Sequence, residues 1–311
     1  MSENSLNLPE VKSLREMIHF GAAEFEAASL YYGHGTDNAL DEAANLAFFA
    51  LKEAPDYSDE RLDLNLTKEN IIAINELFQK RIDTREPAAY LTHEAWFASL
   101  PFYVNENVLV PRSPIAELIE EQFQPWVSPE KVTRILDLCT GSGCIAIACA
   151  LAFPNAEVDA ADISKAALDV AEKNKAKHQL ENRLNIIESD LFGNLQGRRY
   201  DLIVSNPPYV DAEDMANLPD EYRHEPELGL TAGVNGLDLV IPMLRDAKHH
   251  LNPEGVLIVE VGNSEEALAE KFPDVPFMWL SFEYGGEGVF MLDANDVEKH
   301  HNVFAAAAEQ I

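Results

Sequence analysis

The sequence predicts an α/β protein, in which a small helical domain precedes a doubly wound, mostly parallel sheet of seven strands. From about residue 130 onward, short apolar strands alternate with amphipathic helical segments, the pattern of a sheet with helices on both faces. Before residue 95, apolar residues recur at helical spacing instead. A length of 311 residues suits two domains of this kind.

Residues 1–95 are expected to form the helical domain, with helices over residues 6–94. Asp37 or Asn38 can cap a second helix, because both side chains accept hydrogen bonds from free N–H groups at a helix start. Thr67-Lys-Glu-Asn70 opens a third helix, with an acidic residue in its first turn.

A linker over residues 96–113 is expected to separate the two domains. The segment 96–110 is aromatic and β-branched, and Asn105-Glu-Asn107 is a typical turn, so we expect a β-hairpin. Pro111-Arg-Ser-Pro114 then marks the boundary of the sheet domain, residues 114–311, which begins with a helix.

The sheet domain contains seven strand candidates. The last two leave no room for a helix between them, so we expect them to form a hairpin with Gly285-Gly286 in its turn. The candidates are residues 133–138, 157–162, 184–188, 200–205, 255–261, 277–282 and 288–292.

The net charge of −31, from 23 basic and 54 acidic residues, restricts the possible partners. Residues 1–95 hold 8 basic and 18 acidic residues, and residues 96–311 hold 15 and 36, so we expect acidity over the whole surface. Such a surface repels phosphate backbones, which disfavours DNA as a partner. It suits either a strongly basic partner or simply solubility.

The three cysteines, Cys139, Cys144 and Cys149, lie in one apolar stretch without disulfide or zinc-site spacing, and we expect small buried side chains. The N-terminal residues MSENSLNLPEVK lack a signal pattern, and the most apolar run, 143–153, is too short to span a membrane. We therefore expect a soluble cytoplasmic protein without a membrane partner.

A glycine-rich turn, Cys139-Thr-Gly141-Ser-Gly143, follows the first strand of the sheet and predicts a nucleotide-type cofactor site. Ligands of such sheets bind beyond the carboxyl ends of the strands. Gly141 to Ala146 also fits the G-x-G-x-x-A dinucleotide fingerprint, and Asp162 suits a ribose diol in either case. A nicotinamide dehydrogenase is therefore an alternative at this point.

Two features favour S-adenosylmethionine as the cofactor. Asp137 ends the first strand, two residues before the position where many methyltransferases carry their first glycine. At the end of the third strand, Asp190 can accept a hydrogen bond from the adenine amino group and Phe192 can stack on the base. A helix cap at Asp190 and a core position for Phe192 are the structural alternatives.

The tetrapeptide Asn206-Pro-Pro-Tyr209 after the fourth strand is the most specific motif. Its two prolines make a stiff loop that points at the cofactor cleft, where Asn206 would also contact the cofactor. The Asn206 side-chain oxygen and the Pro207 carbonyl can each accept one N–H of a planar NH₂ group. Pro208 and Tyr209 would line the substrate, with the Tyr209 ring against its plane. A dehydrogenase has no use for this loop, whereas methyl transfer to nitrogen depends mainly on such orientation.

Motifs along nearly the whole chain resemble the glutamine-N5 protein methyltransferases, which modify peptide-chain release factors or a ribosomal protein. The resemblance implies a Rossmann-like class I methyltransferase fold, S-adenosyl-L-methionine as donor, S-adenosyl-L-homocysteine as product and a glutamine side chain as acceptor. It is carried by Leu136–Gly143, Asp162, Asp190–Phe192, Asn206–Val210, Glu225–Leu230, Gly236-Leu237 and Glu260–Gly262.

Within the family the chain resembles the subgroup acting on the third large-subunit ribosomal protein. Pro111-Arg-Ser-Pro-Ile-Ala-Glu117 stands where release-factor enzymes typically carry P-R-P-D-T-E, and Cys139 replaces a glycine of the wider family. The resemblance implies a basic ribosomal protein as partner, free or in an early assembly intermediate, recognised by residues 1–95. The acidic segment 211–229 would meet basic residues of the substrate, or form a solvated loop.

Three alternatives stay open at this point. A release-factor glutamine methyltransferase shares the chemistry, an adenine-N6 nucleic-acid methyltransferase uses a related tetrapeptide, and a non-catalytic chaperone would shield a basic protein.

Overall fold

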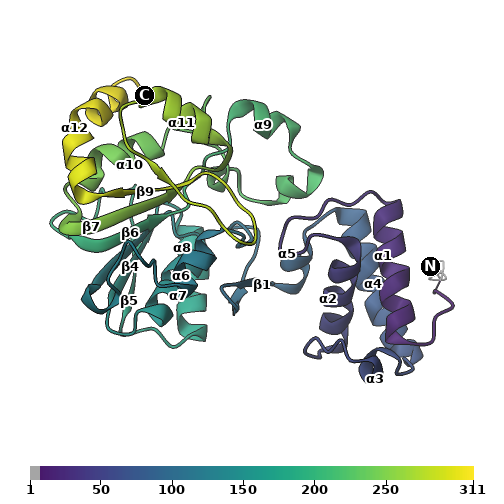
Figure 1. Ribbon diagram of the computed structural model, residues 1–311. Helices are drawn as coiled ribbons and strands as arrows, with labels where there is room; N and C mark the ends of the chain where they lie inside the picture. The colour runs from purple at the N-terminus through teal and green to yellow at the C-terminus, as the bar shows by residue number, and fades with distance from the viewer. Residues whose placement is uncertain (1–7) are drawn as a thin grey trace. The chain divides into compact units, whose positions relative to one another are not determined.

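The computed structural model describes residues 8–311, which form two compact units (Figure 1). The helical unit comprises the residues up to Glu94 together with Pro219–His224, and the sheet unit comprises Ala95–Leu218 and Glu225–Ile311. We predicted residues 219–224 in the sheet domain, but they pack within the helical unit. Residues 1–7, which belong to the N-terminal stretch without a signal pattern and include the start of the predicted helical range, lie outside the described residues.

The helical unit is built around α1, α2 and α4, whose apolar faces meet in one core. Asn38 caps α2 by accepting the N–H of Asp41, and Thr67 forms a capping box with Asn70 at the start of α4. The predicted helical character is confirmed. The helices are α1 (Leu14–Ala27), α2 (Ala39–Leu51), α3 (Asp59–Leu62), α4 (Lys68–Thr84) and α5 (Ala88–Thr92), with the 3₁₀ helix η2 (Asp220–His224).

A two-stranded hairpin of β1 (Glu94–Phe97) and β2 (Leu100–Tyr103) follows. The predicted turn at Asn105–Asn107 forms, with the Val108 N–H donating to the Asn105 carbonyl, but it follows the hairpin and does not connect its strands. The chain instead reverses at Ala98 and Ser99, whose φ angles are 46° and 61°. Two consecutive residues with positive φ match the twist of a tight hairpin, but Ala and Ser give no sequence signal for that conformation.

The predicted seven-stranded, mostly parallel sheet is confirmed, in the order β5-β4-β3-β6-β7-β9-β8. β9 runs antiparallel to both of its neighbours, β7 and β8, and it forms the predicted hairpin with β8. The strand order reverses between β3 and β6, which creates the crevice where such sheets bind ligands. The strands are β3 (Arg134–Leu138), β4 (Glu157–Asp162), β5 (Leu184–Glu188), β6 (Tyr200–Ser205), β7 (Leu251–Glu260), β8 (Met278–Trp279) and β9 (Val289–Asp293).

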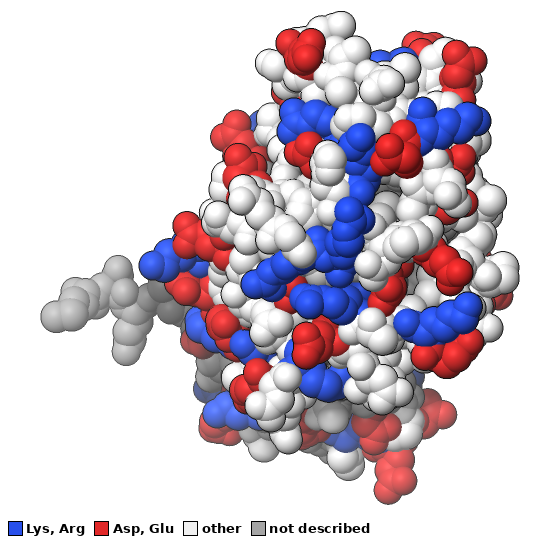
Figure 2. All heavy atoms as spheres, turned by 90° about the vertical axis from the view of Figure 1, so that its left-hand side faces the viewer, with Lys and Arg blue, Asp and Glu red and all other residues white. Residues whose placement is uncertain are grey.

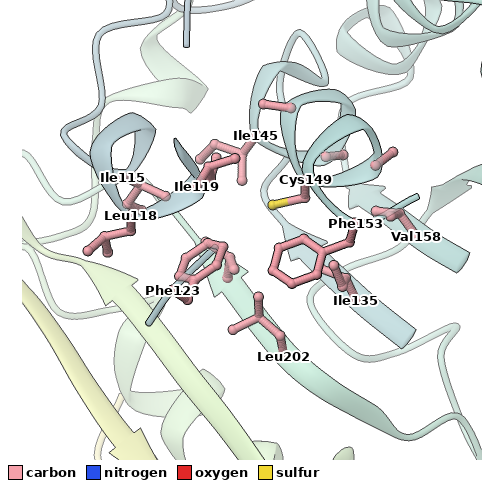
Figure 3. Close-up of a cluster of buried hydrophobic side chains, with 14 of the residues drawn as sticks. Ile115, Leu118, Ile119, Phe123, Ile135, Ile145, Cys149, Phe153, Val158 and Leu202 are labelled. Carbon is pink, nitrogen blue, oxygen red and sulfur yellow. The ribbon is translucent and has the colours of Figure 1, made fainter. Parts of the chain in front are cut away.

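Helices cover both faces of the sheet (Figure 1). Cys149 lies fully buried between α7 and the sheet, as predicted, whereas Cys139 and Cys144 are partly exposed (Figure 3). One face carries α6 (Ile115–Glu120), α7 (Cys144–Ala152) and α8 (Lys165–Lys177); the other carries α10 (Val240–Ala247), α11 (Glu265–Lys271) and α12 (Ala294–Ala308), while α9 (Ala212–Asn217) follows β6. Among residues 8–311, no helix combines the length and apolarity needed to cross a membrane.

The surface charge is less uniform than the sequence suggested. Arg134 and Arg198, near the amino ends of β3 and β6, share the buried carboxylate of Asp159 at 3.2 and 2.7 Å. Figure 2, which looks onto the left-hand side of Figure 1, shows Lys and Arg gathered in a stripe. The expectation of acidity over the whole surface is therefore wrong for this face.

Candidate functional site

In the glycine-rich turn between β3 and α7, three of five consecutive residues have a left-handed backbone conformation. Cys139, Gly141 and Gly143 have φ angles of 58°, 54° and 80°. A Cβ added at Gly141 would meet nothing within 4 Å, whereas one at Gly143 would lie 3.2 Å from the Ala171 side chain on α8. The absence of a side chain at Gly141 thus leaves open space next to the turn. At Gly143 it permits α8 to pack closely against the turn. The φ of Cys139 explains why glycine suits that position in the wider family.

The buried side chain of Asp137 stabilises this turn. Its side chain is fully buried, and one carboxylate oxygen accepts hydrogen bonds from the Thr140 hydroxyl and the Ala146 N–H. Burial raises the pKa of Asp137 to about 7. The sequence predicts Asp137 as a cofactor-binding residue, but its contacts in the structure are with the Thr140 hydroxyl and the Ala146 N–H, which shape the turn.

Asp162, at the end of β4, faces the same turn. Its two carboxylate oxygens accept the N–H groups of Gly141 and Ser164 at 2.9 and 2.8 Å. Burial raises the pKa of this partly exposed carboxyl group. The lone pairs that remain on each oxygen can accept hydroxyl donors such as a ribose diol.

The segment after β5 contains two predicted cofactor-binding residues, one exposed and one buried. Asp190 is exposed, whereas Phe192 is 4% exposed and stacks on His250 with ring centroids 4.4 Å apart. Phe192 therefore has the core position that was its structural alternative. Leu191, between them, is partly exposed with a φ of 42°, a side chain at this edge that the sequence did not single out.

The tetrapeptide begins where β6 ends, at the reversal of strand order. The Ser205 hydroxyl donates to the Leu138 carbonyl at 2.7 Å, which joins the ends of β6 and β3. Asn206, Pro208 and Tyr209 are partly exposed, and Pro207 is buried. The structure thus brings the tetrapeptide and the glycine-rich turn to one edge of the sheet.

Tyr209 is held from three sides. Its hydroxyl donates to the Glu260 carboxylate at 3.0 Å, and its carbonyl accepts from the Ser264 hydroxyl at 3.1 Å. A Cβ added at Gly262 would lie 2.4 Å from the ring, so only glycine leaves room for it there. The ring orientation is therefore fixed by the end of β7 and the turn after it.

Glu260 is a functional candidate that reasoning from the residues did not single out. It is 4% exposed at the end of β7, and it accepts hydrogen bonds from Tyr209 and from the Ser113 hydroxyl, the latter at 2.5 Å. Burial raises the pKa of its carboxyl group, while the two hydroxyl donors and Arg112 act in the opposite direction. An acidic residue closing an apolar strand, GVLIVE, is the signal that could have pointed to it.

The acidic segment after the tetrapeptide is partly used inside the protein. In the sheet unit, Glu225 accepts two hydrogen bonds from Arg112, at 2.6 and 2.7 Å, and a third from the Val110 N–H. In the helical unit, the fully buried Glu221 lies 3.6 Å from Arg81 and 3.1 Å from Arg85. Neither predicted role of the segment, contact with basic residues of the substrate or a solvated loop, therefore applies to these two carboxylates.

Comparison with known proteins identifies the family. Residues 119–219 match the family model described as Methyltransferase small domain. A "Ribosomal protein uL3 glutamine methyltransferase" of Xanthomonas campestris is 50% identical, covering 94% of both chains. The chain belongs to the uL3 glutamine methyltransferase family. A relative with the same name from Xylella fastidiosa is 48% identical over 97% of this chain and 96% of its own.

Solved structures at lower identity share the methyltransferase description. One is the 16S rRNA N2 G1207 methyltransferase of Thermus thermophilus in complex with AdoMet and guanosine. It is 22% identical, with a TM-score of 0.45, covering 64% of this chain and 49% of that one.

Proposed function

We propose that this methyltransferase transfers a methyl group from S-adenosyl-L-methionine to the side-chain amide nitrogen, N5, of a glutamine in uL3, the third protein of the large ribosomal subunit. The observation that carries the proposal is the position of Asn206-Pro-Pro-Tyr209 at the end of β6, beside the glycine-rich turn. The named activity of the two relatives supports the choice of acceptor.

The residues around the glycine-rich turn fit the donor. Open space before Gly141, the free lone pairs of Asp162 and the exposed carboxylate of Asp190 together offer a cradle and polar partners for an adenosine group. S-adenosyl-L-methionine supplies an electrophilic methyl group and leaves as S-adenosyl-L-homocysteine. We assign Cys139, Gly141, Gly143, Asp162, Asp190 and Asn206 to its binding, with Asp137 beneath the turn.

The tetrapeptide orients the acceptor amide. The Asn206 side-chain oxygen and the Pro207 carbonyl each accept one N–H, so the nitrogen presents its face to the methyl group. Pro208 and the fixed ring of Tyr209 border the amide plane and exclude water. Because the nitrogen becomes acidic only as it gains the methyl group, its proton is lost after transfer, once the product reaches solvent, and orientation supplies most of the catalysis.

We propose that the substrate is uL3 free in the cytoplasm or in an early assembly intermediate. A net charge of −31 attracts a basic ribosomal protein but repels ribosomal RNA and DNA. Equal rates of methylation for assembled subunits and free uL3 would contradict this.

The test is an assay with labelled donor in which free uL3, a release factor and DNA are offered in parallel. Mass spectrometry then maps the product. We expect methylglutamine in uL3 alone. Label in the release factor would overturn the substrate, and label in DNA would overturn the chemistry.

Replacing Asn206 separates the two halves of the site. We expect Asn206→Ala to abolish transfer, because the amide then loses an acceptor that orients it, while donor affinity measured by calorimetry stays within a few-fold. Asn206 is one of several residues assigned to the donor, so a loss of donor affinity larger than a few-fold would contradict its main role in orienting the acceptor.

A further inference from the structure

The sheet unit has a pocket of about 460 Å³ next to α6. This volume lies within the range of about 300–1,000 Å³ that is usual for ligand pockets. Three segments line it: the hairpin turn at Ser99, residues 112–120 leading into and along α6, and the β8–β9 loop with Tyr284 and Gly286.

One wall of the pocket, the β8–β9 loop, belongs to the part of the sheet beyond β6. The cofactor residues end β3, β4 and β5, whereas the β8–β9 loop leads into β9, whose Val289 pairs with Glu260 of β7. Ser113 lines the pocket and donates to Glu260, which accepts from Tyr209. Two hydrogen bonds therefore connect the pocket wall to the catalytic tetrapeptide.

Contacts within the protein hold the pocket wall in place. The Glu117 carboxylate accepts the N–H groups of Glu283 and Tyr284 at 2.8 and 3.1 Å, which fastens the β8–β9 loop to α6. Gly286 packs on Pro114 so closely that a Cβ there would come within 2.6 Å of that ring. Because these contacts preorganise the walls, little free energy of binding is lost in ordering them.

The lining is acidic and aromatic. Glu117 and Glu120 contribute two carboxylates, and the charge of Arg112, the one basic residue of the lining, is matched by its two hydrogen bonds to Glu225. The Tyr284 side chain is 83% exposed, an unusual position for a large ring, and its face is open to contact. Carboxylates beside an open aromatic face suit a guanidinium or ammonium group, through ion pairing and cation–π contact.

We propose that this pocket binds an arginine or lysine side chain of the protein substrate that flanks the target glutamine. The proposal rests on the proposed function, since a basic protein must present the glutamine. It gives the acidic enzyme a local contact that distinguishes one segment of a basic protein from another.

The test compares Glu120→Gln and Tyr284→Ala with Glu121→Gln. Glu121 is the exposed neighbour of Glu120 but does not line the pocket, so its variant has the same net charge without the pocket change. All three side chains replaced are exposed, and folding should be unaffected. The assay measures kcat and KM for free uL3, together with the donor dissociation constant.

We expect the KM for uL3 to rise about three- to tenfold in Glu120→Gln and in Tyr284→Ala, the size of one partly exposed ion pair or cation–π contact. The kcat, the donor affinity and the KM of Glu121→Gln should stay close to wild type. A KM for Glu120→Gln equal to that of Glu121→Gln would overturn the proposal, as would a change in kcat alone.

A second arm identifies the occupant. Each Lys or Arg near the methylated glutamine of uL3 is replaced by Ala, and one of these substrates should lose its sensitivity to Glu120→Gln and Tyr284→Ala. If every substrate keeps that sensitivity, the pocket binds no basic side chain. Failure of the proposed function would differ from both outcomes, because the wild-type enzyme would then not methylate uL3.

Discussion

Replacing Gly262 by alanine should displace Tyr209 without touching the cofactor turn. The added Cβ would lie 2.4 Å from the ring Cε2 and 2.8 Å from Cζ, whereas carbon atoms pack at about 3.5–4.0 Å. The ring must therefore move by about 1 Å. A 3.0 Å hydrogen bond from Tyr209 to Glu260 then stretches beyond hydrogen-bonding distance.

The expected loss in kcat is about 100-fold, since a displacement of about 1 Å in a positioned group commonly has that effect. This corresponds to about 2.7 kcal/mol in the activation barrier. Donor affinity should stay near wild type, because the residues around Gly141 do not move. Methyl transfer at saturating donor and uL3 gives kcat, and calorimetry gives the donor dissociation constant.

A matched control separates displacement from backbone strain. Gly262 has a φ of 46°, so alanine there also strains the backbone by about 1–2 kcal/mol. Gly197 has a φ of 77°, but a Cβ there meets nothing within 4 Å. Gly197→Ala thus carries strain alone. If kcat for Gly262→Ala lies within about threefold of this control, the ring position does not limit the reaction.

Two predictions concern stability. A carboxyl group whose pKa is higher in the folded than in the unfolded protein stabilises the fold at low pH, and this contribution is lost as pH rises through the folded pKa. The pKa of Asp137 is raised to about 7 from an ordinary 3.8. The free energy of unfolding should therefore fall by about 4 kcal/mol between pH 4 and 8 because of this group. Urea denaturation of Asp137→Asn should lack that decline, and parallel pH profiles would refute the assignment. Glu221→Ala should destabilise the helical unit by about 1–3 kcal/mol, because it removes the acceptor of the Tyr31 N–H and a carboxylate near Arg81, which keeps its ion pair with Glu42. The exposed neighbour Asp220 provides the control, and equal denaturation midpoints for the two alanine variants would contradict the role of Glu221.

The sequence predicted the parts of the site that depend on local pattern. The strand ends, the glycine-rich turn and the tetrapeptide all follow from short apolar runs and the residues that interrupt them. The reversal between β3 and β6 then brings them together, as doubly wound sheets require.

What the sequence did not predict depends on distant partners. Glu221 and Glu225 lie in a segment predicted to meet substrate or solvent, yet both are buried, because arginines far along the chain meet them. The buried hydrogen bond of Glu260 with Ser113 likewise joins residues far apart in the chain. Phe192 lies in the core, where His250, in the turn between α10 and β7, stacks on it. Such pairings are absent from any local window of residues.

The stripe of Lys and Arg in Figure 2 gives the sheet unit an electric dipole moment in addition to its net charge. Arg134 and Arg198 lie near the amino ends of β3 and β6, while Asp162 ends β4 and Asp190 follows the end of β5. A polycation approaching from solution therefore experiences a torque as well as an attraction. It is turned toward the tetrapeptide before any contact forms, so a larger share of encounters begins at the productive edge.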